Sequence, residues 1–232
     1  TIAMMTAAVS ALAVESSNTF GILRVDSSAA QTIVSVPWLA AGGGDIDVAD
    51  VVKTANLNNG DKLHYYNTTT EKYRVWELTN GSWVEAVPAG DTSTDNPTLA
   101  RGNAIILERF APQGGSIANC FYLYGQYTTT ASSTTCVANG YTLLAPPSTA
   151  ETDLNTKTWT TPGANDNIIL QNATVLHYRD VSGTMKWGKL TKVLDRETGV
   201  ITETVDPSVA KIAAGEGAWY HNNQNTAVTV QW

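Results

Sequence analysis

The chain has 232 residues, of which 43% are hydrophobic and only 15% are charged, against about 25% charged residues in an ordinary soluble domain. Fourteen lysines and arginines against 21 aspartates and glutamates give a net charge of −7, so the sequence lacks the basic surface that a nucleic-acid partner requires. The sequence has no apolar run of the roughly 18 residues that indicate a transmembrane span. Such a neutral, polar composition is typical of a β-rich extracellular protein.

The amino-terminal segment, residues 1–14, carries no charge and includes an Ala-Leu-Ala sequence at 11–13. This is the form of a signal-peptide core followed by a cleavage site. Apolar residues also recur there at helical spacing, namely Ile2, Met5, Val9 and Leu12. Two interpretations follow: a leader that is removed during secretion, or a retained assembly arm over residues 1–17, either helical or donated as a strand to a neighbouring subunit.

Alternating apolar and polar residues predict short strands through the first half of the chain. These strands are expected at 20–25, 32–36, 62–66, 73–78 and 82–86. The Asn80-Gly81 pair between the last two is a strong hairpin signal and predicts a type I′ turn. One short helix is expected over residues 49–57, where Val48, Val51, Val52 and Ala55 share a face.

The second half continues in the same way. A hairpin is expected from Met185–Leu194 and Val200–Val205, with Gly199 in a left-handed turn position. Many short strands separated by turns predict a β-sandwich or barrel in each half.

A weak internal repeat relates the two halves. The Leu-His-Tyr sequence at 63–65 recurs 113 residues later at 176–178, and Trp76 is echoed by Trp187. Further matches keep the same order: 34–38 with 142–147, 101–106 with 214–219, and 120–126 with 227–232. Collinear matches at a steady offset indicate duplication. We therefore predict an all-β chain of two tandem, internally duplicated sandwich-like or barrel-like halves, residues 18–126 and 127–232, with short helical segments and the apolar amino-terminal arm.

The only two cysteines, Cys120 and Cys136, flank a segment that reads as strand, polar turn and strand. Antiparallel strands would bring the two thiols within bonding range, and secretion would supply an oxidising compartment. A structural disulfide is the prediction, and two free, unrelated thiols are the alternative.

No motif for a nucleophilic enzyme or a zinc site occurs in the sequence, so we expect neither catalysis nor a catalytic cofactor. One acidic cluster follows three glycines and consists of Asp45, Asp47 and Asp50. Closely spaced carboxylates of this kind either hold a structural calcium ion or cap the helix that follows them.

Seven tryptophans are present, and three of them stand next to expected loops: Trp38, Trp83 and Trp159. Exposed aromatic rings at loops are where a sugar-binding module stacks its ligand. The other reading places these rings in the cores or at a subunit interface, because large aromatic side chains dominate the energetics of both.

Several segments resemble a family of uncharacterised secreted bacterial proteins: the Ala-rich leader, an early strand that ends in Val-Pro, the Gly-Asp-x-Leu-x-x-Tyr-Asn stretch at 60–67, Trp-x-Leu followed by Gly-x-Trp, and a later Leu-Tyr-Gly-Gln. The resemblance implies secretion and no obvious active site. The sequence thus predicts a non-enzymatic structural protein at the cell surface, a subunit that assembles with itself into a filament, sheath or surface layer. The alternative is a carbohydrate-binding or adhesin module that uses exposed aromatics.

Overall fold

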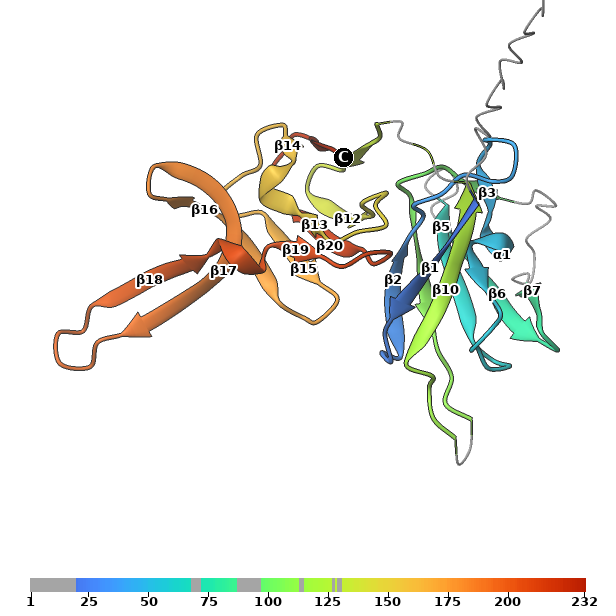
Figure 1. Ribbon diagram of the computed structural model, residues 1–232. Helices are drawn as coiled ribbons and strands as arrows, with labels where there is room; N and C mark the ends of the chain where they lie inside the picture. Colours follow the sequence, from blue (N-terminus) through green and yellow to red (C-terminus); the bar gives the residue numbers. More distant parts are fainter. Residues whose placement is uncertain (1–19, 68–71, 87–96, 113–114, 127, 129–130) are drawn as a thin grey trace, which may run out of the picture.

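The computed structural model describes residues 20–67, 72–86, 97–112, 115–126, 128 and 131–232 and is shown in Figure 1. It consists mostly of β-strands, so the chain is all-β as the sequence predicts. No helix in these ranges is long and apolar enough to cross a membrane. The amino-terminal segment, with Ile2, Met5, Val9 and Leu12, lies outside the described residues.

The first half forms one large sheet and two small ones. Its elements are β1 (Phe20–Asp26), β2 (Gln31–Ser35), β3 (Ile46–Asp47), α1 (Val48–Val51), β4 (Val52–Lys53), β5 (Lys62–Asn67), β6 (Lys72–Thr79), β7 (Ser82–Ala86), β8 (Thr98–Leu99), β9 (Ala104–Glu108) and β10 (Cys120–Gln126). The sheets have the orders β2-β9-β5-β6-β7, β1-β10-β4 and β3-β8.

The second half has the same kind of arrangement. Its elements are β11 (Ser133–Cys136), β12 (Gly140–Leu144), β13 (Thr152–Asp153), the 3-10 helix η1 (Leu154–Thr156), β14 (Thr158–Trp159), β15 (Asn167–Leu170), β16 (Val175–Val181), β17 (Thr184–Leu194), β18 (Ile201–Asp206), η2 (Pro207–Val209), β19 (Lys211–Ile212), β20 (Ala218–Asn222) and β21 (Val228–Gln231). The sheet orders are β12-β20-β15-β16-β17-β18, β11-β21-β14 and β13-β19.

The strand orders of the two halves correspond element by element. Strands β11 to β17 take the places of β1 to β7, strands β19 to β21 take those of β8 to β10, and η1 takes that of α1. Strand β18 has no counterpart among the described residues of the first half, and the segment between β7 and β8, residues 87–96, lies outside them. The Leu-His-Tyr sequences at 63–65 and 176–178 lie on β5 and β16, and Trp76 and Trp187 lie on β6 and β17. Neither pair occupies corresponding strands, because the counterpart of β5 is β15 and that of β6 is β16.

Each half has its own hydrophobic core. The first core takes residues from the five-stranded sheet, such as Leu63 and Leu107, and from the sheet β1-β10-β4, such as Leu123. The second core is built around Trp187 and Tyr220, both fully buried. In each half the core takes residues from both the large sheet and the three-stranded sheet.

The two halves are joined by backbone hydrogen bonds along the outer edge of β2. Ser35 N donates to Gly215 O at 3.0 Å, and Gly217 N donates to Ile33 O at 2.9 Å. The hydroxyl of Ser35 also donates to Pro146 O at 2.6 Å. A side chain added at Gly217 would come within 2.6 Å of Ile33 Cγ2, so the close approach requires glycine. The described residues of the two halves thus meet in a hydrogen-bonded interface.

A buried aspartate stands just before the same strand in each half. Asp61 precedes β5 and Asp166 precedes β15, and both side chains are 0% exposed. Asp61 accepts hydrogen bonds from the backbone N–H of Asn58, at 2.9 Å, and from that of Phe110. Burying a carboxylate is costly unless its oxygens are hydrogen-bonded, and here the partners are backbone groups of two separate loops.

The arrangement around Asp166 is the same. Its carboxylate accepts from the N–H groups of Gly163 at 2.7 Å and Asn223 at 2.8 Å. The hydroxyl of Tyr220 donates to it at 2.7 Å, and burial, with this hydrogen bond, raises the pKa of Tyr220. Each aspartate thus fixes the loop before its own strand to the end of the neighbouring strand, β9 or β20.

Replacement of Asp166 by alanine is expected to lower the free energy of unfolding by about 3–5 kcal/mol, because several buried donors lose their acceptor at about 1–3 kcal/mol each. Urea unfolding followed by far-UV circular dichroism measures this change. The control is Asp45→Ala, at an exposed carboxylate, for which a change within about 0.5 kcal/mol is expected. A loss below about 1 kcal/mol for Asp166→Ala would contradict the argument.

The local predictions meet different outcomes. The Asn80-Gly81 turn has positive φ at both residues, 52° and 80°, and Gly199 has φ of 69°, as the sequence predicts. The helix predicted over 49–57 is wrong in length: α1 ends at Val51 and the chain continues into β4, which pairs with β10. Two consecutive β-branched residues, Val51 and Val52, favour this early change to a strand.

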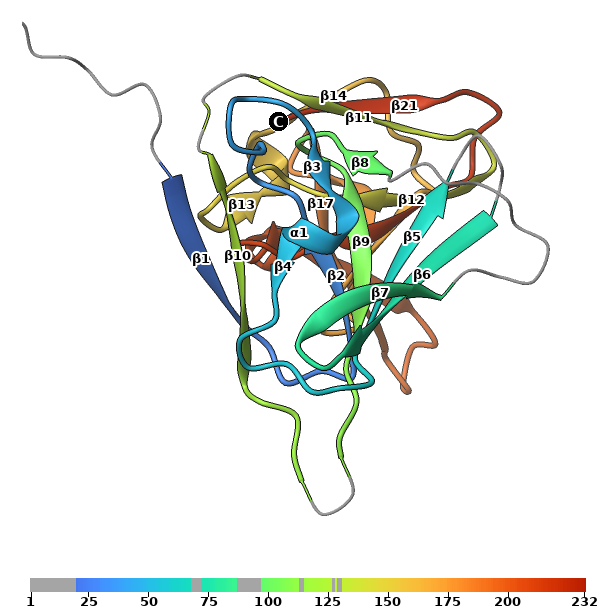
Figure 2. The same cartoon turned by 90° about the vertical axis from the view of Figure 1, so that its right-hand side faces the viewer.

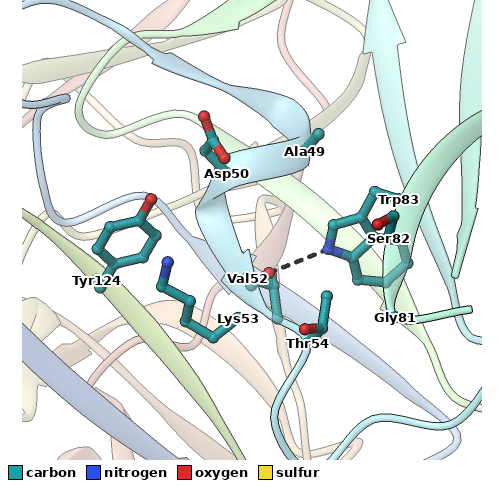
Figure 3. Close-up of a pocket in the computed structure, with 9 residues that line it drawn as sticks. All are labelled: Ala49, Asp50, Val52, Lys53, Thr54, Gly81, Ser82, Trp83 and Tyr124. Atoms are coloured by element: carbon teal, nitrogen blue, oxygen red, sulfur yellow. Dashed lines mark hydrogen bonds between the residues drawn. The ribbon is translucent and has the colours of Figure 1, made fainter.

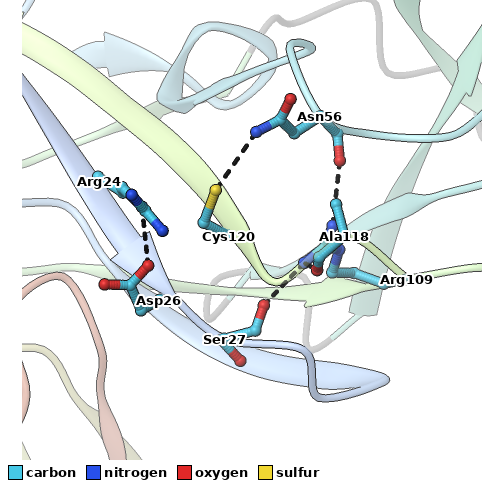
Figure 4. Close-up of polar contacts among 7 residues, drawn as sticks. All are labelled: Arg24, Asp26, Ser27, Asn56, Arg109, Ala118 and Cys120. Atoms are coloured by element: carbon cyan, nitrogen blue, oxygen red, sulfur yellow. Dashed lines mark hydrogen bonds and ion pairs between the residues drawn. The ribbon is translucent and has the colours of Figure 1, made fainter. Parts of the chain in front are cut away.

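The predicted disulfide between Cys120 and Cys136 is wrong, since both cysteines are free and buried. Cys120 is the first residue of β10, and the strand carries the chain about 20 Å further before the segment leading to β11 begins. Strand β10 pairs with β1 and β4, whereas β11 pairs with β21. The Sγ atom of Cys120 accepts a hydrogen bond from Asn56 Nδ2 at 3.3 Å (Figure 4).

Beside Cys120 a buried arginine connects three loops. Arg109 is 4% exposed. Its guanidinium donates to the carbonyl oxygens of Ser27 at 2.9 Å, Ala118 at 2.8 Å and Asn56 at 3.1 Å (Figure 4). Burial lowers the pKa of Arg109. These contacts keep the surroundings of the thiol closed to solvent.

We expect neither thiol to react with a disulfide reagent such as DTNB in the folded protein, and both to react after unfolding. Cys136 is 0% exposed, and burial raises the pKa of its thiol to about 12, so its reactive thiolate form is rare at neutral pH. The measurement is a thiol titration with and without denaturant. A gain in mass on reduction would instead reveal a disulfide.

Candidate functional site

The acidic cluster named from the sequence lies around the start of α1. Within the described ranges no group of three or more histidine, cysteine, aspartate or glutamate side chains is placed to hold a metal ion. Asp45 and Asp50 are exposed. Asp47 occupies the N-cap position of α1, but its side chain makes no capping hydrogen bond. Neither reading of the cluster is therefore supported by a contact.

The three tryptophans named from the sequence lie in different environments. Trp38 is 6% exposed and packs so closely on β1 and β10 that a side chain added at Gly21 would come within 2.3 Å of its ring. Trp159 packs on the second core, with its ring 5.3 Å from that of Trp187 and 5.8 Å from that of Tyr220. Trp83 lines a surface pocket.

This pocket has a volume of about 310 Å³ and lies between α1, β4, β10 and the turn before β7 (Figure 3). The Trp83 indole N–H donates to Val52 O at 3.1 Å, which fixes the ring. Across the pocket the Lys53 amine lies 3.2 Å from the centroid of the Tyr124 ring, a cation–π contact. The pocket thus combines aromatic surface with an ammonium group and the carboxylate of Asp50.

The second surface feature is a hairpin that projects from the second half. The outer part of β17 and β18 form an antiparallel pair, residues 190–206. From here on we call this hairpin the arm; it is a different segment from the amino-terminal residues 1–17. Figure 1 shows it extending away from the first half. All residues from 191 to 204 are exposed, and only the base of the arm, at Leu190 and Val205, is half-buried. The sequence predicts this hairpin but gives no function to it.

Four large apolar side chains lie at the tip of the arm. Their exposed fractions are 57% for Val193, Leu194 and Val200 and 60% for Ile201. Leu194 and Ile201 are direct cross-strand partners, so their side chains lie next to each other on one face of the hairpin. We call this pair the apolar step. The sequence contains a signal for this apolar tip: one pair of apolar residues precedes the polar turn at 195–199 and another pair follows it.

The turn and the stem of the arm are held by polar contacts. Asp195 accepts hydrogen bonds from the N–H groups of Glu197 at 2.9 Å and Thr198 at 3.3 Å; its hydrogen bonds with Thr198 and Glu197 lower the pKa of Asp195. In the stem, Lys192 lies 2.5 Å from the Glu203 carboxylate and lowers its pKa. The arm is thus an ordered hairpin that presents apolar side chains to solvent.

No family model, no curated protein and no solved structure matches this chain. The resemblance to secreted bacterial proteins stays a prediction.

Proposed function

We propose that the chain is a non-enzymatic extracellular structural protein whose copies assemble with one another into a filament, sheath or surface layer. The arm is the observation that carries this proposal. Contiguous exposed apolar side chains on an ordered element are typical of a protein interaction site. Strand β18 is also the last strand of its sheet, and an edge strand has unpaired backbone groups that favour pairing with another chain.

We further propose that the two halves are duplicated β-sandwich domains. The support is the correspondence of their strand orders and of the buried aspartates that precede β5 and β15. On this proposal β18 is the one strand without a counterpart among the described residues.

The extracellular location is supported by the leader-like amino-terminal sequence and by the low content of charged residues. Both thiols are buried, so an oxidising environment would leave them unreacted.

Charging the tip of the arm is expected to abolish assembly. In Leu194→Lys/Ile201→Lys, two ammonium groups replace the apolar step, and their burial against a second copy would be costly. Because both positions are more than half exposed, the fold of the monomer is expected to remain intact. Sedimentation velocity and negative-stain microscopy compare the variant with the unmodified chain.

The control is Val84→Lys, which places one ammonium group at a residue 53% exposed on β7. We expect this control to assemble as the unmodified chain does. Assembly of the double variant at the normal concentration would refute the role of the arm, and a strictly monomeric unmodified chain would refute the proposed function.

The pocket at Trp83 favours a second candidate function, carbohydrate binding. Its volume is at the lower end of the roughly 300–1,000 Å³ of small-ligand sites. If sugars bind there, Trp83→Ala is expected to weaken binding at least about tenfold, through loss of the stacking surface. Glycan-array screening followed by titration calorimetry measures this effect. The control is Tyr141→Ala, which removes an aromatic ring that is 58% exposed on β12.

A further inference from the structure

We propose that the sheet β1-β10-β4 of one copy receives the arm of a second copy. This inference rests on the proposed function and names the missing half of the contact. An arm that joins subunits needs an acceptor surface, and the described residues place a second exposed apolar surface in the first half of the chain. We call it the β1 face; it consists of Phe20, Ile22, Tyr122, Tyr124 and Lys53.

The β1 face is apolar where solvent reaches it most. Phe20 is 52% exposed and Ile22 is 76% exposed. Ile22 is directly opposite Tyr124 in the β1–β10 ladder, so its side chain extends the aromatic surface of β10 outward. Strand β1 is also the outermost strand of its sheet. The face therefore offers both an apolar patch and an edge at which a further strand can pair.

The second half provides an internal comparison for this surface. Its corresponding sheet is β11-β21-β14, and the exposed positions of β11 are Ser133 and Thr135. Thr135 lies opposite Thr229, with their hydroxyl oxygens 3.2 Å apart. The corresponding sheet of the second half therefore forms with polar residues at its exposed positions. The apolar residues of the β1 face are not required by the sheet, which points to a role in contact with another molecule.

The arm carries a net charge of −2, with the acids Asp195, Glu197, Glu203 and Asp206 against Lys192 and Arg196. Within it Lys192 pairs with Glu203. The β1 face carries the ammonium group of Lys53 on β4. Arg24 on β1 has an exposed guanidinium, and Tyr122 on β10 is the cross-strand partner of both residues. Arg24 pairs with Asp26 at 2.8 Å while both stay exposed. Opposite charges at the rim orient two surfaces as they meet.

The positions of the two surfaces favour a contact between copies. The arm extends from the second half away from the first (Figure 1), whereas β1 lies at the edge of the first half (Figure 2). An arm in this position points away from the β1 face of its own subunit. Two different surfaces on one subunit give a head-to-tail contact, which continues as an open chain unless its rotation closes a ring. A second copy of this chain can therefore contact both surfaces: its β1 face receives the arm, and its arm binds the β1 face of a further copy.

The test combines a variant of the acceptor with the variant of the arm. Ile22→Lys charges the centre of the β1 face, and Thr135→Lys is its matched control on the corresponding strand β11. We expect Ile22→Lys to raise the concentration needed for assembly by about tenfold or more, and Thr135→Lys to leave it unchanged. Circular dichroism and thermal unfolding verify that each variant is folded.

Mixing gives the decisive measurement. Ile22→Lys keeps an intact arm, and Leu194→Lys/Ile201→Lys keeps an intact β1 face. An equimolar mixture can make one correct contact for each pair of chains, so we expect heterodimers by sedimentation velocity and no polymer. Each variant alone is expected to remain monomeric.

The other outcomes separate the two proposals. Assembly of Ile22→Lys at the normal concentration, with the arm variant monomeric, would overturn the acceptor assignment and leave the proposed function standing. An arm that pairs with a second arm predicts that same result. If the unmodified chain stays monomeric at every concentration, the proposed function and this inference fall together.

Discussion

Two buried carboxylates hold together the loops on which both halves depend. Asp61 and Asp166 each accept backbone N–H groups from a loop before one central strand and from the end of its neighbour. An ionised side chain is stable in such a place only when donors surround it. The backbone donors constrain the path of the chain in both halves, and Asp166 also accepts hydrogen bonds from the side chains of Tyr220 and Gln224. The two halves accordingly share strand order while their side chains diverge.

This division between a fixed backbone and variable side chains also explains where function can arise. The arm of the second half and the β1 face of the first half are two places where one half differs from the other in the exposed apolar surface of its described residues. Neither departure disturbs a core, since the residues at the tip of the arm and at Ile22 are largely exposed. A surface that costs little in the folding of the monomer can be selected for contact with another chain.

The strands and tight turns were predictable from the sequence, whereas the contacts between distant segments were not. Alternation marks β5, β6 and β7, and Asn80-Gly81 marks their tightest turn because both residues tolerate positive φ. The free cysteines were missed because sequence proximity suggested a hairpin, while β10 and β11 find their partners far along the chain. The buried aspartates were missed because an acid before a strand looks like an ordinary turn residue. Their recurrence before an apolar strand in both halves was the available signal.

The junction between the halves determines what kind of polymer the proposed contact would build. Backbone hydrogen bonds from Ser35 to Gly215 and from Gly217 to Ile33 fix one half on the other, so the arm and the β1 face of a subunit keep a constant relative orientation. When a rigid subunit is joined head to tail, each copy is related to the next by the same rotation and translation. A flexible linker would instead change that relation at every step and give an irregular chain. The close approach at Gly217 is therefore as important to a regular assembly as the apolar tip of the arm itself, although it lies far from either contacting surface.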